Sequence, residues 1–155
     1  MMADHFPQAA REVMEDRFGR DTVLSLATVG EGGPAVRLVN AYYEDGAFYV
    51  ITHALSGKVR QIERDPAVAV CGQWFTARGR GENLGWLGGG ENAALAARLR
   101  RVFADWYQNG HLDEGDPNSC ILCIRLDSGV LMSHGTRYDI DFAAARAAKE
   151  RGSER

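Results

Sequence analysis

The stretch AVRLVNAYYEDGAFYVITHALSGKVRQIERDPAVAV, residues 35–70, decides the fold of this chain. It contains three apolar, β-rich runs and one segment with helical spacing, which ends at Pro66. The runs are residues 35–43, 47–52 and 67–74, and the helical segment is residues 56–65. Only the tight turn Glu44-Asp45-Gly46 joins the first two runs, which indicates an antiparallel hairpin. The pattern therefore favours an antiparallel sheet over the alternating strands and helices of a Rossmann fold.

The flanking sequence extends this pattern in both directions. Further β-rich runs occupy residues 23–29, 75–84, 120–126 and 130–133, the last two around the turn-like residues 127–129. Helical spacing predicts helices over residues 4–18, 91–108 and 139–151. We expect a single domain over residues 1–155, with an N-terminal helix within 1–20 and a C-terminal helix and tail within 139–155. The predicted fold is mainly β, an antiparallel β-barrel with flanking helices.

Composition excludes several classes of protein. The 155 residues are 45% hydrophobic and 25% charged, which is ordinary for one globular domain. The net charge of −3 lacks the basic footprint of a nucleic-acid binder. Three cysteines are an odd number, so a disulfide framework is not expected. We find neither an apolar run of ~18–20 residues nor a signal peptide, and expect a cytoplasmic protein that binds neither membrane nor nucleic acid.

The segment from Thr52 to Lys58 is the most informative for function. It joins a strand to a helix N-terminus, whose first backbone N–H groups have no partners within the helix and lie at the positive end of its dipole. Ser56 adds a hydroxyl, Gly57 lets a ligand approach the backbone, and Lys58 adds a full charge. With Arg37 from an earlier strand, these residues predict a phosphate site. An ordinary Ser-capped helix with a solvated lysine is the alternative.

Three other sequence features are weaker evidence for function than the segment from Thr52 to Lys58. The glycine-rich stretch Gly79 to Gly85 lacks the third glycine of a dinucleotide-binding turn, and we reject that reading. Cys120 and Cys123 have CxxC spacing within a β-rich run, where the two thiols would point to opposite faces. No metal site or catalytic triad is readable from the spacing. His53 and Trp74 are candidates for a substrate side, His53 because it precedes the phosphate turn and Trp74 because it can stack on a flat ring.

Four segments together resemble the pyridoxamine 5'-phosphate oxidase-like family of FMN-binding split barrels. They are residues 35–40, 48–52, 56–62 and 65–70, and the order of Arg, Thr, Ser-x-Lys, Gln-Ile and Asp-Pro-x-Val carries the resemblance. The later stretches, residues 81–85 and 120–142, are similar to a less characterised branch of that family.

The resemblance implies a homodimer with FMN at the subunit interface. Arg37, Lys58, Ser56 and the backbone of Gly57 would hold the FMN phosphate, and Thr52 would also contact the cofactor. The backbone of Leu38, Val39 and Asn40 would face the polar edge of the isoalloxazine ring. A deazaflavin coenzyme and haem are alternative cofactors.

This sequence departs from the authentic oxidase at substrate positions. Gly57 replaces a basic residue of the turn, Tyr42 replaces a lysine that binds the substrate phosphate, and the C-terminal arginine-histidine motif is missing. We therefore expect an FMN-dependent oxidoreductase that acts on an unknown small molecule rather than on pyridoxamine phosphate. The alternative function is a non-catalytic carrier or sensor of flavin or haem.

Overall fold

The computed structural model describes residues 4–107 and 112–153 of the chain. The helices are α1 (Gln8–Phe18), α2 (Gly57–Arg64), the 3-10 turn η1 (Gly90–Asn92), α3 (Ala93–Val102), α4 (Ala104–Tyr107) and α5 (Phe142–Ser153). The strands are β1 (Thr22–Gly30), β2 (Gly33–Glu44), β3 (Ala47–His53), β4 (Ala67–Gly72), β5 (Phe75–Trp86), β6 (Ser119–Ser133) and β7 (Thr136–Asp141). Among the described residues, no helix is long and apolar enough to cross a membrane.

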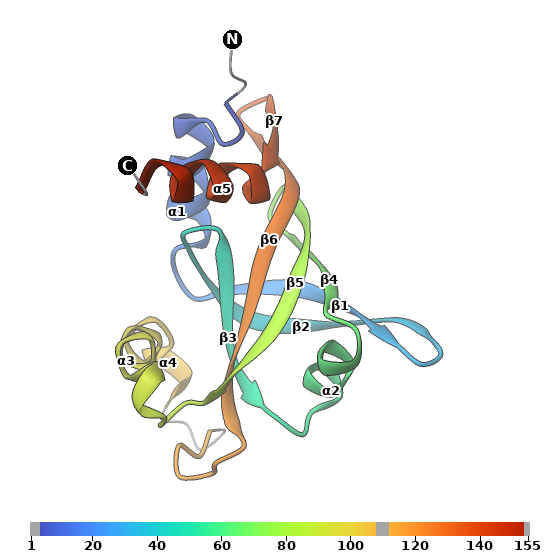
Figure 1. Ribbon diagram of the computed structural model, residues 1–155, viewed down its shortest axis with the longest axis vertical. Coiled ribbons are helices and arrows are strands. Elements are labelled where there is room, and N and C mark those ends of the chain that lie inside the picture. The colour runs from blue at the N-terminus through green and yellow to red at the C-terminus, as the bar shows by residue number, and fades with distance from the viewer. Residues whose placement is uncertain (1–3, 108–111, 154–155) are drawn as a thin grey trace.

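The strands form one antiparallel sheet in the order β3-β2-β1-β4-β5-β6-β7. An additional pairing of β3 with β6 closes strands β1 to β6 into a barrel, and β7 extends the sheet beyond β6. Closure pairs most of the backbone groups that a free sheet edge would otherwise expose. The helices stand at the two ends of this barrel, α1 and α5 at one end and α2, α3 and α4 towards the other (Figure 1). The mainly β, antiparallel barrel predicted from the sequence is confirmed.

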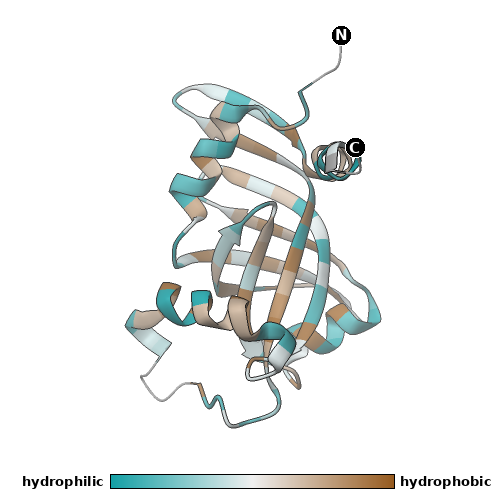
Figure 2. Ribbon diagram, turned by 60° about the vertical axis from the view of Figure 1, so that its left-hand side comes forward, coloured by the Kyte–Doolittle hydropathy of each residue, from teal (hydrophilic) through white to brown (hydrophobic). Residues whose placement is uncertain are grey.

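The principal core fills the barrel. Hydrophobic residues alternate with hydrophilic ones along the barrel strands (Figure 2), as strands with one covered face require. On β1, Leu24 and Leu26 point inward and are buried, while Val23 is exposed. Helix α1 closes one end of the barrel with Met14 and Phe18, and the Phe18 ring packs on Phe48 at 5.6 Å between centroids. Burying such side chains stabilises the fold by ~1.5–3 kcal/mol each.

A second core lies outside the barrel, between β6 and the helices that follow β5. Leu99 of α3 and Phe103 are fully buried there against Ile121 of β6. Strand β6 is consequently covered on both faces, and residues 119–124 are all buried. This explains why residues 120–124 of β6 are continuously apolar instead of alternating.

Helix α2 lies across β5 because residue 81 has no side chain. A Cβ at Gly81 would stand 2.8 Å from Cγ2 of Ile62, which is closer than carbon atoms pack. Ile62 and Val59 are the buried residues of α2. This close approach seats the helix whose N-terminus carries the candidate phosphate site.

Two predicted boundaries in the second half of the chain are wrong. The runs 120–126 and 130–133 are one continuous strand, β6, in which Asp127 is skipped where the register with β5 shifts between Arg78 and Gly79. Gly129 suits this place because a Cβ there would lie 3.1 Å from the Phe75 ring. The C-terminal helix begins at Phe142 instead of 139, because residues 136–141 pair with β6 as β7.

The long helix predicted over residues 91–108 is interrupted. It consists of η1, α3 and α4, with breaks after Asn92 and at Phe103. The buried amide of Asn92 donates to the carbonyls of Leu84 and Trp86, which ties it to the end of β5. The Trp106 indole donates to Asp21 over 3.1 Å, which fixes α4 against another part of the fold. The end of the predicted helix at residue 108 and the start of the following loop at 111 lie outside the described residues.

Candidate phosphate and cofactor site

The N-terminus of α2 presents unpaired polar groups. Ser56 is the N-cap residue, in extended conformation, but its side chain makes no capping hydrogen bond. Its Oγ atom is buried and has no hydrogen-bond partner among the described residues. A buried hydroxyl without a partner is unfavourable by about 1–3 kcal/mol, so native proteins seldom leave one unless a ligand satisfies it. A Cβ at the adjacent Gly57 would meet nothing within 4 Å, which leaves open space above the first turn.

Arg37 is fixed beside this helix by neutral oxygen atoms. Its side chain leaves β2 and donates from Nη1 to Thr28 Oγ1 over 2.7 Å and from Nη2 to Gln61 Oε1 over 3.1 Å. Partial burial lowers the pKa of the guanidinium. Neither Thr28 nor Gln61 carries charge, so the positive charge of Arg37 is oriented but not neutralised.

Lys58 brings a second positive charge to the same place. Burial first, and then the charge of Arg37, lower the pKa of the Lys58 ammonium below its ordinary value, and the thiol of Cys120 acts weakly in the opposite direction. Within residues 4–107 and 112–153, no carboxylate pairs with either cation. Two half-buried cations that repel one another are stabilised when an anion binds between them.

The backbone of Leu38, Val39 and Asn40 is open on one side. This part of β2 pairs with β1, whereas β3 pairs with β2 only from Tyr42 to Glu44 among the described residues. Alternate N–H and C=O groups of the stretch therefore face away from β1 without a strand to receive them. Val39 points into the core and Leu38 is 70% exposed, while the Asn40 amide donates to Asp21.

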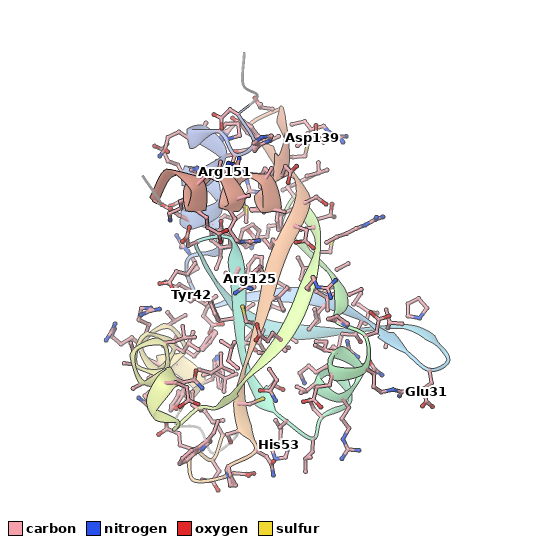
Figure 3. The ribbon with its side chains drawn as sticks, viewed as in Figure 1. Glu31, Tyr42, His53, Arg125, Asp139 and Arg151 are labelled. Atoms are coloured by element: carbon pink, nitrogen blue, oxygen red, sulfur yellow. The ribbon has the colours of Figure 1, made fainter. Side chains whose placement is uncertain are left out.

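Thr52 and His53 end β3 close to the cradle. The backbone of Thr52 pairs with Cys120 of β6, and the Cys120 thiol interacts electrostatically with Lys58. The His53 ring, at the lower end of the barrel in Figure 3, accepts from Leu55 N–H at Nδ1 over 3.3 Å. Its Nε2 lies 3.0 Å from Asp116 Oδ2, so this network assigns the proton to Nε2. A cavity of about 440 Å³ opens here, lined by Ile51, Thr52, His53, Trp106, Leu112, Asp113, Asp116 and Ser119.

Trp74 is not brought to the cradle within one chain. It lies in the turn between β4 and β5 at φ +51° and is 78% exposed. Arg37 contacts Thr28, which faces Val68 near the start of β4, whereas Trp74 lies beyond the other end of that strand. The backbone is held there by Arg17, which donates to the neighbouring Gln73 carbonyl over 2.8 Å.

Two residues of the site were not singled out from the sequence. Thr28 is a buried polar residue in β1, and Gln61 lies on the face of α2 that turns towards it. Gln61 belongs to the Gln-Ile pair that carried the family resemblance, which is the one signal that pointed to it. Their role depends on the register that sets Leu26 of β1 against Arg37 of β2, and no local sequence pattern contains that register.

The structure agrees with setting aside the cysteine and glycine motifs. Cys120 and Cys123 are free, buried residues of β6. Cys120 is influenced by Lys58 and Glu63, whereas Cys123 contacts Tyr49, so the two thiols lie in different surroundings. Burial raises the pKa of the Cys120 thiol to about 11, which makes it a poor nucleophile or metal ligand. The Gly79–Gly85 stretch lies in β5.

The arrangement fits a phosphate monoester with a flat ring system beyond it. Arg37 and Lys58 supply the positive charge, and the unpartnered Ser56 Oγ supplies a hydroxyl donor. The N–H groups of the first turn of α2 supply backbone donors. The open edge of β2, which follows Arg37 directly, offers further backbone hydrogen-bonding groups.

Solved structures with the same fold come from several bacteria. The General Stress Protein 26 from Bacillus anthracis is 22% identical over 77% of this chain and 90% of its own, with a TM-score of 0.59. A FAD-binding protein from Mesorhizobium loti is 21% identical over 72% of this chain and 85% of its own, with a TM-score of 0.53. A heme binding protein from Mycobacterium smegmatis is 19% identical over 91% of this chain and 61% of its own, with a TM-score of 0.66.

At these identities the structural matches establish the fold. No curated protein matches the sequence significantly. A family model described as pyridoxamine 5'-phosphate oxidase matches residues 7–131, which is most of the chain and contains the whole cradle. The protein therefore belongs to the pyridoxamine 5'-phosphate oxidase family.

Proposed function

We propose that this protein binds FMN and acts as an oxidoreductase on a small organic molecule. The observation that carries the proposal is the buried Ser56 Oγ without a partner, placed beside two cations that have no carboxylate among the described residues. Such a site is unfavourable when empty and becomes favourable when a phosphate enters. The FAD-binding protein from Mesorhizobium loti, which shares the fold, supports a flavin as the cofactor.

In this proposal Arg37, Ser56, Gly57 and Lys58 hold the FMN phosphate, and Thr52 contacts the cofactor further along. Residues 38–40 offer backbone groups to the polar edge of the ring. The bound flavin supplies the electron-transfer chemistry, so the protein has to bind the flavin and the substrate, orient them and exclude water. His53 lies at the wall of the cavity next to Thr52, where Asp116 and the Leu55 N–H hold its ring in place.

We further propose that two copies pair through the outer face of β1, β2 and β4. Val36 and Leu38 are 69% and 70% exposed there, and the register places them against Ala27 and Ser25. A groove of about 680 Å³ continues over Ala69 and Cys71 to β5 and β6. Exposed apolar area of this kind marks an interaction surface. A second copy is the occupant because its coverage of Leu38 would also close the open edge of β2 over the cofactor ring.

The test begins with the visible absorption spectrum of the purified protein and the mass of whatever denaturation releases. The proposal expects a flavin spectrum and the FMN mass, and FMN uptake by protein purified without it. Lys58→Ala should weaken FMN binding about tenfold to a hundredfold, because a charged hydrogen bond is lost. Arg60→Ala is the matched control, since Arg60 is an exposed cation two residues further along α2 and on another face of the helix. Unchanged FMN retention in Lys58→Ala would remove the cradle assignment.

A non-catalytic carrier or sensor of flavin or haem is the second candidate. The heme binding protein from Mycobacterium smegmatis, which shares the fold, supports this alternative. A Soret band in the purified protein would favour haem over FMN. With flavin bound, continuous oxidation of a reduced nicotinamide in the presence of an acceptor would indicate an enzyme, whereas a single stoichiometric reaction would indicate a carrier.

A further inference from the structure

A second cavity lies at the opposite end of the barrel, between α1, α5 and the β2–β3 turn. Its volume is about 670 Å³, which is within the range of small-molecule sites. Figure 1 shows α1 and α5 at this end of the barrel, with the β2–β3 turn reaching towards it. The lining is Phe6, Arg11, Glu44, Asp45, Gly46, Ala47, Tyr49, Arg125, Phe142, Ala145, Arg146, Lys149 and Glu150. No residue of the proposed FMN cradle belongs to it.

Positive charge predominates in this cavity. Four cationic and three acidic side chains line it. Glu44 accepts from Arg98 over 3.0 Å, and Asp45 lies 3.3 Å from Lys149. The guanidinium groups of Arg11, Arg125 and Arg146 have no carboxylate partner among the described residues, which leaves the cavity with uncompensated positive charge.

Two of these guanidinium groups are held in place by backbone oxygen atoms. Arg146 is half-buried and donates from Nη2 to the Leu126 carbonyl over 3.0 Å and to the Gly46 carbonyl over 3.5 Å. Arg11 donates from Nε to the Phe6 carbonyl over 3.0 Å and lies 4.3 Å from the centre of the Phe6 ring. Carbonyl groups orient a guanidinium without cancelling its charge, so both cations are ordered before a ligand arrives.

Arg125 completes the cluster and is the exposed member. It projects from β6 below α5 (Figure 3), and its side chain forms no salt bridge within the described residues. Its direct neighbour across the sheet is Arg80 of β5, and like charges in that position destabilise a strand pair. Phe6 and Phe142, whose rings pack edge to face at 5.0 Å, give the cavity an apolar wall.

We propose that this cavity binds a small organic molecule with at least two negative charges, carried by carboxylate or phosphate groups. Guanidinium groups bind both kinds of oxyanion with paired hydrogen bonds, and the phenyl wall accommodates a short carbon skeleton. The site is independent of the FMN cradle.

The test is calorimetric titration at low salt with two probes, citrate for the carboxylate class and glycerol 3-phosphate for the phosphate class. We expect at least one probe to bind with a Kd below about 1 mM, and Arg125→Ala to weaken it about tenfold or more. Arg125→Ala is suitable because the exposed side chain forms no salt bridge within the described residues whose loss would disturb folding.

Two controls separate this site from the rest of the surface. Arg137→Ala removes an exposed arginine that pairs with Asp139 outside the cavity, and it should leave the affinity unchanged. Lys58→Ala removes a cation of the FMN cradle and should also leave it unchanged. The proposal would be overturned if neither probe bound, or if Arg125→Ala bound the probe as tightly as the wild type. Loss of binding in Lys58→Ala would also overturn it, because the anion would then occupy the FMN cradle.

Discussion

Burial first, and then the positive charge of Arg37, lower the pKa of Lys58, although Arg37 lies on a barrel strand and Lys58 on a helix. Folding therefore brings two like charges together at a partly buried position, which lowers stability in the absence of a compensating anion. Proteins tolerate such an arrangement where binding depends on it. This relationship determines how the cradle should respond to pH and to substitution.

The affinity for FMN should fall as the pH is raised through the alkaline range. In the free protein the pKa of Lys58 is lowered from its ordinary value of 10.5, and a bound phosphate raises it again. At a pH between the pKa of Lys58 in the free protein and its pKa in the complex, FMN binding is accompanied by proton uptake at Lys58. The affinity for FMN therefore declines as the pH rises through this range. Below this range Lys58 is protonated in both states, and its charge causes no pH dependence. Fluorescence titrations from about pH 7 to about pH 10 measure this, and Lys58→Arg should remain flat because arginine stays charged.

Ser56→Ala should separate stability from binding. An ordinary N-cap serine stabilises its helix, and its loss costs about 1 kcal/mol. The Ser56 Oγ is buried without a partner in the described part of the chain, so its removal should leave the free energy of unfolding of the FMN-free protein unchanged or raise it by about 1 kcal/mol. FMN binding should weaken by about tenfold. Urea unfolding and fluorescence titration of the same samples provide both values, and a destabilised variant with normal FMN affinity would show that Ser56 is only a helix cap.

Leu38→Asp should produce a monomer. The side chain is 70% exposed in a single chain, so a charge there costs the isolated subunit little, but burying that charge between two subunits is unfavourable. Sedimentation velocity measures the change in oligomeric state. Glu12→Arg, on the exposed side of α1, is a control that alters charge elsewhere. A wild-type protein that sediments as a monomer would contradict the proposed pairing directly.

Gly81→Ala should destabilise the fold by about 1–3 kcal/mol, because the added Cβ would stand 2.8 Å from Cγ2 of Ile62. Moving α2 away from β5 also moves the N-terminus of α2, so FMN affinity should fall in parallel with stability. Gly32→Ala is the matched control, since a Cβ at that position meets nothing within 4 Å. Thermal unfolding together with FMN titration checks both expectations. Full stability in Gly81→Ala would mean that Ile62 rearranges without moving the helix.

The sequence alone determined the architecture of the first half of the chain and the residue types of the cradle. Strand alternation, the Glu44-Asp45-Gly46 turn and the Pro66 stop are local signals, because backbone conformation and the burial of one face repeat along the chain. Ser56 and Lys58 were identifiable for the same reason, since the start of a helix has a local chemical signature. The predicted element boundaries failed where distant contacts compete with local preference, as at Phe103 and around residues 127–129.

Only the tertiary structure decided which of those residues act together. The β1–β2 register and the packing of α2 place Thr28 and Gln61 beside Arg37, and their hydrogen bonds hold Arg37 near the start of α2, where Lys58 lies. These residues are far apart in the sequence. The same closure leaves Trp74 beyond the far end of β4 from the cradle. It also gathers Arg11, Arg125 and Arg146 from three elements into one cavity. Long-range contacts of this kind depend on the packing of the whole barrel, which is why no local pattern of residues predicts them.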